Sequence, residues 1–262
     1  MNIKIKKAIH NRELEALSLL TVIVMWQFAA DLLVKNKLFL PSFVDVVLSF
    51  LKVIKSGAIY TDLSVSLLHF VIGMFLAFII GLPIGIMMGW FKGANHVFDP
   101  VIEILRPIPP LAWIPFAIIW FGLTHQSAGF VVFIGAVFPI IINTYTGFKS
   151  VPVVYVEAAK VLGCMRDQNL IRYVALPSAL PSIAAGVRIA MGVGWMCLVA
   201  AEMFGVSNNG LGYKIWWHYH LHQMDFVLVY MLLLGFLGLL IDRVFRYYVD
   251  DRLLKWRVGV VM

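Results

Sequence analysis

Three histidines in the last fifth of the chain have a spacing that could hold a metal. They are His218, His220 and His222, and Asp225 follows closely. Helical spacing would place His218 and His222 on one face, which suits Zn²⁺ or Cu²⁺. Aromatic residues at 216, 217 and 219 lie among them and are typical of the belt at a membrane–water interface. The aromatic neighbours favour the belt, so His218 and His222 are weak metal candidates.

Polar residues inside apolar runs form a second group. Arg188 lies in such a run, where a charge costs about 2.5–3.5 kcal/mol at a helix centre. It either lines a pathway and attracts an anion, or reaches the interface and bonds helix-end carbonyls. Glu202 is about 21 Å farther along the helix axis, so the two cannot pair; we expect it at the outer mouth, as a gate or a structural partner. Asn143 and Thr144 are further pathway candidates, with interhelical hydrogen bonds as the alternative.

Enzyme chemistry finds little support in the residue pattern. No carboxylate pair or Ser/His/Asp set stands out, and neither G-x-x-x-x-G-K-[ST] nor a dinucleotide fingerprint occurs. The two cysteines, Cys164 and Cys197, have no metal or redox spacing, so no disulfide framework is implied. The sequence predicts no catalytic residue and no cofactor bound by this chain.

Composition places the chain in a membrane. Of its 262 residues, 61% are hydrophobic and 13% charged, against about 25% charged in soluble domains. The net charge of +7 does not indicate nucleic acid, because Lys and Arg lie between apolar runs rather than along one face.

Six apolar segments predict six transmembrane helices in a single transmembrane domain over 1–262, with a core at about 64–247. A run of about 20 residues spans the hydrocarbon core. We expect spans at 14–34, 67–91, 111–122, 127–148, 182–204 and 226–247. The stretch 106–110 is rich in proline and cannot be regular helix.

Basic residues predict the orientation. With the N-terminus inside, fifteen Lys and Arg residues lie on the inner side and five on the outer side, and Arg188 lies within a span. Both termini and the loop between the fourth and fifth spans are therefore expected in the cytoplasm, and the protein in the plasma (inner) membrane.

Two further segments predict local structure. Ser42 can cap an amphipathic, interfacial helix beginning at Phe43. In the second span, Gly81, Gly85 and Gly89 recur every four residues and allow another helix to approach closely, while Pro83 is expected to kink that span.

A polar loop at about 150–177 interrupts the apolar runs. The stretch 153–162 contains good helix formers, and Gly163 can end it in a left-handed conformation. Asp167 can cap a second short helix that Leu176-Pro177 would end. The small side chains of Ala158 and Ala159 leave a bare patch suited to docking in another protein, although a solvated loop helix would have the same pattern.

This loop resembles the cytoplasmic signature of ABC importer permeases, E-A-A-x3-G followed by L-P. The surrounding sequence is similar to the nitrate, sulfonate and taurine permeases within that family. The matching phrases are LPS at 40–42, IPPLAWIPFAIIWFG at 108–122, FPIIINT at 138–144 and LPSALPSIAAGVRIA at 176–190. The likeness covers nearly the whole chain, most firmly 64–212.

The resemblance implies partners. In that family the loop helix docks on an ATPase subunit, so the matching coupling residues are Glu157, Ala158, Ala159, Gly163, Leu176 and Pro177. ATP and Mg²⁺ would be bound by that partner. A second permease copy, an extracytoplasmic binding protein and membrane lipid complete the expected surroundings. Twelve residues separate Gly163 from Leu176, where the family usually has eleven, so the second loop helix is expected to be bulged or differently angled.

The prediction is an all-α membrane protein with a coupling helix between the fourth and fifth spans. It would be the permease subunit of an ATP-driven importer for a small anion such as sulfonate, taurine, nitrate or bicarbonate. One alternative is an ion-coupled secondary transporter, which usually carries acidic sites in the membrane; only Asp31, Glu202 and Asp242 are candidates. The other is a membrane metalloenzyme built on the histidines.

Overall fold

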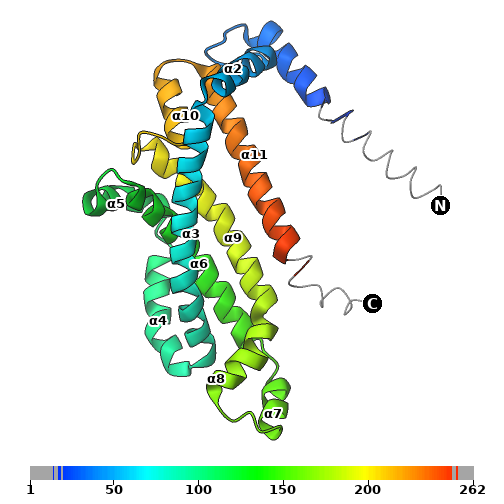
Figure 1. Ribbon diagram of the computed structural model, residues 1–262, viewed down its shortest axis with the longest axis vertical. Helices are drawn as coiled ribbons and strands as arrows, with labels where there is room; N and C mark the ends of the chain where they lie inside the picture. The colour runs from blue at the N-terminus through cyan, green and yellow to red at the C-terminus, as the bar shows by residue number, and fades with distance from the viewer. Residues whose placement is uncertain (1–13, 15–16, 19, 250–251, 253–262) are drawn as a thin grey trace, which may run out of the picture. The chain divides into compact units, whose positions relative to one another are not determined.

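The computed structural model describes residues 14, 17, 18, 20–249 and 252, and within these it contains helices and no strand (Figure 1). The chain divides into two compact units. One comprises the chain up to Thr61 together with Lys214–Leu233, and the other comprises Asp62–Tyr213 with the chain from Leu234 onward. The first predicted span lies partly outside the described residues.

The first unit is organised around helix α2 (Phe43–Ser56). Ser42 begins it with a capping box, in which its hydroxyl accepts from the Asp45 amide and the Asp45 carboxylate accepts from the Ser42 amide. Its buried face carries Val46, Ser49 and Val53. The amphipathic helix predicted from Phe43 is therefore confirmed. An apolar helix, Leu20–Val34, precedes it and ends in a π-helical turn, Ala29–Val34.

Most of the second unit is formed by long apolar helices. They are α3 (Ala58–Trp90), α6 (His125–Lys149), α9 (Leu176–Met203) and α11 (Met224–Tyr248). Helices α3 and α11 begin in the first unit and continue into the second, whereas α10 (Leu211–His220) begins in the second unit and continues into the first. Among the described residues, four helices are long and apolar enough to span a membrane, one of them being α9 together with the segment before it. The predicted fourth and sixth spans match α6 and α11 to within two residues at either end.

Helix α6 lies between α3 and α9 and is largely buried (Figure 1). Glycines allow this close approach. A Cβ on Gly85 of α3 would lie 2.6 Å from the Thr144 Cβ, and one on Gly186 of α9 would lie 2.5 Å from the Asn143 Cβ. Gly81 and Gly89 also face α6, which agrees with the four-residue glycine spacing read from the sequence. Pro83 lies inside α3, which continues through it.

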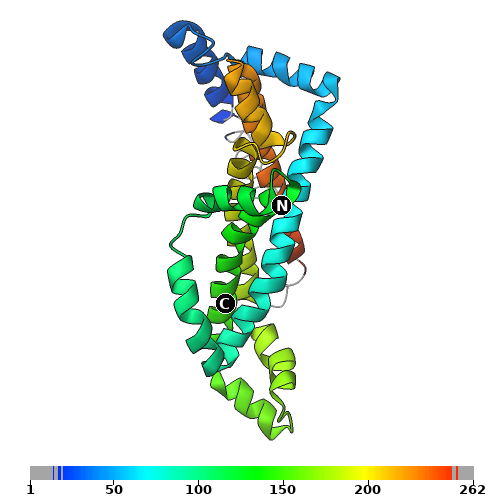
Figure 2. The ribbon, with the colours of Figure 1, turned by 90° about the vertical axis from the view of Figure 1, so that its left-hand side faces the viewer.

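The predicted third span, 111–122, is wrong. It consists of a 3₁₀ turn, η2 (Pro110–Trp113), and the eight-residue helix α5 (Ile114–Phe121), too short to cross a core of about 30 Å. Helix α4 (Lys92–Leu105) precedes them at an angle of 87°, visible in Figure 2. The break falls in the proline-rich stretch, as expected, so α4 and α5 together form a broken span or a re-entrant loop.

The predicted helix end at Leu176-Pro177 is also wrong. Helix α8 (Asp167–Leu170) passes through a π-helical turn, η3 (Ile171–Ala175), directly into α9. Pro177 is the second residue of α9, which directly follows the π turn, so the helix continues through this proline. A π turn accommodates an additional residue in a helix. The bulge expected from the twelve-residue spacing is therefore present, and the helix continues where a stop was predicted.

We expect Gly85→Ala to destabilise the second unit because its new methyl group would collide with Thr144. Overpacking of this kind costs about 1–3 kcal/mol. Thermal unfolding of the detergent-purified protein measures the effect. The matched control is Gly93→Ala, at a helical glycine whose Cβ would meet no atom within 4 Å. Equal unfolding temperatures for the two variants would contradict close packing of α3 on α6.

The cap of α2 should depend on pH. The Lys37 ammonium lies 2.9 Å from the Asp45 carboxylate and, with Ser42, holds the pKa of that carboxyl below its ordinary 3.8. The same hydrogen bond raises the pKa of Lys37 above 10.5. Asp45 therefore adds stability above pH 3.8 and loses it as the pH falls through its folded value, while Lys37 adds stability below pH 10.5.

Asp45→Asn should weaken the cap of α2 at neutral pH. In this variant the stability of the cap should no longer fall as the pH is lowered into the acid range. A lost cap costs about 0.5–2 kcal/mol. Amide hydrogen exchange over residues 43–49, corrected for intrinsic rates, reports the difference. Acid-sensitive protection that persists in Asp45→Asn would show that another group controls this helix start.

Candidate functional site

The polar loop forms short helices that lie beyond one end of α3, α6 and α9 (Figure 2). Helix α7 (Val153–Val161) contains no buried residue. Its apolar side chains are instead exposed, with Val161 at 88% and the following Leu162 at 87% of full exposure. The helix predicted at 153–162 is confirmed, and its apolar side chains are left largely uncovered by the described residues.

Gly163 reverses the chain after α7. Its φ of +92° is left-handed, and its amide donates to the Lys160 carbonyl at 3.0 Å. The next amide, of Cys164, donates to Ala159 O at 2.9 Å. A Cβ here would meet no atom within 4 Å, so the backbone conformation alone requires glycine. The predicted left-handed end at Gly163 is confirmed.

A groove of about 490 Å³ runs between α7 and the start of α9. Ala158, Ala159 and Leu162 form one wall, while Tyr173, Val174, Pro177 and Ser178 form the other, with Tyr155 at its edge. The two alanines provide the width because larger side chains would fill it. Three of the sequence-predicted coupling residues, Ala158, Ala159 and Pro177, therefore line one depression.

The other predicted coupling residues lie around this groove. Glu157 is exposed beside the alanines and can present a carboxylate to a partner. Leu176 is turned into the protein, where it packs with Phe148 and Ile183. The tyrosines at 155 and 173 were not predicted, since Tyr173 reaches the groove only because η3 continues into α9.

Glu202 lies in a buried network rather than in an open pathway. Its side chain has no exposure. The carboxylate accepts from the Ser66 hydroxyl at 2.8 Å and the Gly212 amide at 2.8 Å, and the His69 Nδ1 lies 2.9 Å away. These hydrogen bonds satisfy a carboxyl group that is buried in an apolar interior. Of the two roles expected for Glu202, these contacts are those of a structural partner.

The network extends beyond Glu202. His69 Nε2 lies 2.7 Å from the Nδ1 of His125, and the Ser66 hydroxyl accepts from the Leu211 amide. Asp62 accepts from the Gly210 amide at 3.3 Å. No sequence signal connects these residues, because more than 130 positions separate the α3 members from Glu202.

Asn143 and Thr144 are packed between helices. The Asn143 amide donates to its own helix at Pro139 O, 2.9 Å away, and its side chain lies against Gly186. Thr144 is fully buried against Gly85. Their contacts are those of helix packing. The interhelical hydrogen bonds expected as the alternative are not found, because Asn143 bonds within its own helix and the buried Thr144 hydroxyl has no hydrogen-bond partner among the described residues.

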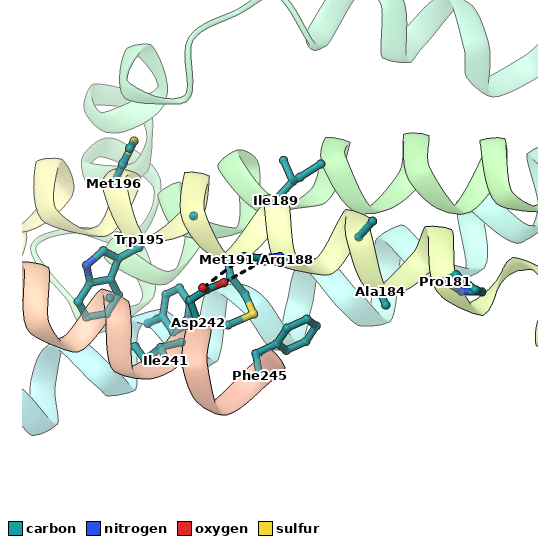
Figure 3. A pocket seen from close by; sticks show the side chains of 14 residues that line it. Pro181, Ala184, Arg188, Ile189, Met191, Trp195, Met196, Ile241, Asp242 and Phe245 are labelled. Carbon is teal, nitrogen blue, oxygen red and sulfur yellow. Dashed lines mark hydrogen bonds and ion pairs between the residues drawn. The ribbon is translucent and has the colours of Figure 1, made fainter. Parts of the chain in front are cut away.

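Arg188 does line a cavity. The cavity measures about 670 Å³ and lies between α9, α11 and Phe70 of α3. The Arg188 Nε donates to the Asp242 Oδ1 at 2.8 Å, and its Nη2 donates to Oδ2 at 3.4 Å. Figure 3 shows the two side chains pointing toward each other across the helices, with Trp195 and Phe245 nearby. Asp242 also accepts from Arg246.

The histidine spacing does not form the expected face. Helix α10 ends at His220, and His222 has a left-handed φ of 58°, so His218 and His222 do not share a helical face. The His218 ring stacks on Phe226 with centroids 4.8 Å apart, and its Nδ1 lies 2.7 Å from Gln223. Within the described part of the chain, no group of three His, Cys, Asp or Glu residues could hold a metal.

Comparison with known proteins gives consistent matches. Residues 81–254 match the family described as binding-protein-dependent transport system inner membrane component. A putative ABC transporter permease of Methanocaldococcus jannaschii is 41% identical over 90% of this chain and 88% of its own. The putative aliphatic sulfonates transport permease of Bacillus subtilis is 36% identical over 90% and 84%. The taurine transport system permease of Escherichia coli is 34% identical over 82% and 84%.

A solved structure shares the fold. A chain of the MetNI methionine ABC transporter in an inward-facing conformation aligns with 72% of this chain and 95% of its own, with a TM-score of 0.54 and 21% identity. The family match covers more than half of the chain, and three relatives exceed 30% identity over most of it. The chain therefore belongs to the binding-protein-dependent inner membrane permeases and is a multi-pass permease subunit of an ABC importer.

Proposed function

We propose that this permease carries a small anionic solute, such as a sulfonate, taurine, nitrate or bicarbonate, across the inner membrane. ATP and Mg²⁺ would be bound by separate ATPase subunits. An extracytoplasmic binding protein would deliver the solute, and a second permease copy would complete the pathway. The proposal is supported by relatives named for aliphatic sulfonates and for taurine.

The groove beside α7 is the observation that supports coupling to an ATPase. An exposed apolar surface rimmed by polar residues is typical of a protein docking site. Here the exposed Leu162 lines the groove and the exposed Val161 precedes it, while Glu157, next to Ala158 in α7, is an exposed charged residue. We propose that Glu157, Ala158, Ala159, Gly163 and Pro177 form the surface on which the ATPase docks, with Leu176 anchoring it from inside.

The proposed topology has six spans with both termini in the cytoplasm. The four long apolar helices, the bent pair α4–α5 and the apolar helix at Leu20–Val34 together supply six segments. The excess of Lys and Arg places the polar loop on the same side as the termini. ATP binding would then draw the docked loops together, and hydrolysis would release them. The transporter thus needs two conformational states whose free energies differ by a few kcal/mol, and the bound nucleotide shifts the equilibrium between them.

Co-purification with the ATPase encoded beside this permease tests the docking surface. We expect Glu157→Lys to lower recovery of the complex about tenfold, equivalent to about 1.4 kcal/mol, because it reverses the charge beside the groove. Gly163→Val should have a similar effect, because a β-branched residue is strained at positive φ and would displace α7.

Matched controls separate docking from general damage. Asp167→Lys makes the same charge reversal in the same loop outside the groove. Gly57→Val introduces the same kind of strain at a φ of +72° in the other unit. Both controls should retain the ATPase. Transport without any bound ATPase would refute the proposed function.

A further inference from the structure

The pair Arg188–Asp242 differs from every other charged contact described above because it lies within apolar spans and borders a cavity. Both residues are more than five positions from the ends of α9 and α11. Their side chains nevertheless keep 43% and 32% of full exposure. Ionisable residues in membrane helices almost always face a water-filled cavity or the bundle interior, and they mark ligand pathways.

The cavity has the dimensions and chemistry of a small-molecule site. Its 670 Å³ falls within the range of about 300–1,000 Å³ for such sites. Its walls are mostly apolar, including Phe70, Trp195 and Phe245. Arg188 and Asp242 are the charged residues among those lining it. In such a cavity a charged residue binds the charged group of a ligand and thereby orients it, while the apolar walls contact the rest of the ligand.

Arg188 has N–H donors that Asp242 does not use and that a ligand could accept from. A guanidinium carries five N–H donors in a planar fork. Two atoms of Arg188, Nε and Nη2, donate to Asp242, and the Nη2 contact is long at 3.4 Å. Asp242 is at the same time held by Arg246. Two guanidinium groups thus share one carboxylate, and the remaining N–H donors of Arg188 are left at the cavity.

We propose that Arg188 binds the anionic group of a small oxyanion in this cavity, and that Asp242 occupies the arginine when no anion is bound. A sulfonate, carboxylate or bicarbonate oxygen pair matches the guanidinium fork as the Asp242 carboxylate does. Exchange is feasible because Asp242 keeps Arg246 as a partner after releasing Arg188. The inference rests on the proposed anion transport and adds the residue that recognises the anion and the residue that competes with it.

Opposite effects of two substitutions test this competition. The binding constant of methanesulfonate is measured by calorimetry on the full chain in a non-ionic detergent, at fixed chloride concentration. Arg188→Gln should weaken binding at least tenfold, and Arg188→Lys should weaken it less because it keeps the charge but not the fork. Asp242→Asn should tighten binding about tenfold, since the competing carboxylate is gone. A pair that is merely structural would give no increase in Asp242→Asn.

Three controls define the site. Dimethyl sulfone, a neutral molecule of similar shape, should not bind. Lys37→Gln, which breaks the ion pair with Asp45 in the other unit, should leave methanesulfonate binding unchanged. Gly192→Leu should abolish it, because Gly192 lines the cavity and its Cβ would meet no atom within 4 Å, so the larger side chain would occupy cavity space.

Several results would overturn the proposal. They are unchanged binding in Arg188→Gln, equal loss in Arg188→Gln and Asp242→Asn, or binding of dimethyl sulfone. Phospholipid phosphate that co-purifies with the native chain but not with Arg188→Gln, without any methanesulfonate binding, would assign the site to a lipid headgroup instead. Recovery of the ATPase is measured on the same samples and should be unchanged in Arg188→Gln. If the native chain did not recover the ATPase, the proposed importer function would be refuted. If the ATPase were recovered normally but methanesulfonate did not bind, only the proposed anion site would be refuted.

Discussion

Close contact between α6 and its two neighbours is the constraint on which the second unit depends. Membrane helices gain little from burying apolar side chains, because the lipid is equally apolar, so their association relies on packing and backbone approach. Gly73 and Gly85 bring α3 onto α6, and Gly186 brings α9 onto its other side. On α6 itself, Gly135 meets Cys197, and Gly147 meets Ser182 and Ala179. Thr144 and Asn143 are therefore packed against glycines of the neighbouring helices.

The same packing connects the groove to the cavity. From Asp167 to Met203 the chain is one helical segment, interrupted only by the π turn η3. Pro177 lines the groove and Arg188 lines the cavity, eleven residues or about 16 Å farther along the axis. Since α9 is held against α6 over its length, a displacement at the groove would move the helix as a body. A continuous helix transmits such a movement better than the two-helix loop that Leu176-Pro177 seemed to predict.

The sequence was sufficient where a local rule decides the structure. Ser42 and Asp45 predict the start of α2 through the capping box, and Gly163 predicts the reversal after α7 through its left-handed backbone. Prediction failed where neighbours outside the segment, or the exact register, decide. Hydropathy at 111–122 is that of a span, yet α5 has only eight residues because prolines and Gly122 bound it. A proline after leucine indicated a helix end, but a π turn directly before Leu176 changes the hydrogen-bond register, and the helix continues through Pro177.

Glu202 and Arg188 are both charged residues in one apolar helix, and their surroundings in the structure differ. Glu202 has no exposure, and donors from α3 and from the start of α10 surround its carboxylate. Releasing it for a solute would leave a buried carboxyl group without hydrogen-bond partners, which is unfavourable. Arg188 borders a cavity, keeps unused donors and shares its partner with Arg246. A bound anion would replace one carboxylate at Arg188 by another group of like charge, so no charge is left buried alone. The capacity for exchange, rather than the presence of a charge in a span, makes Arg188 the candidate for recognising a solute.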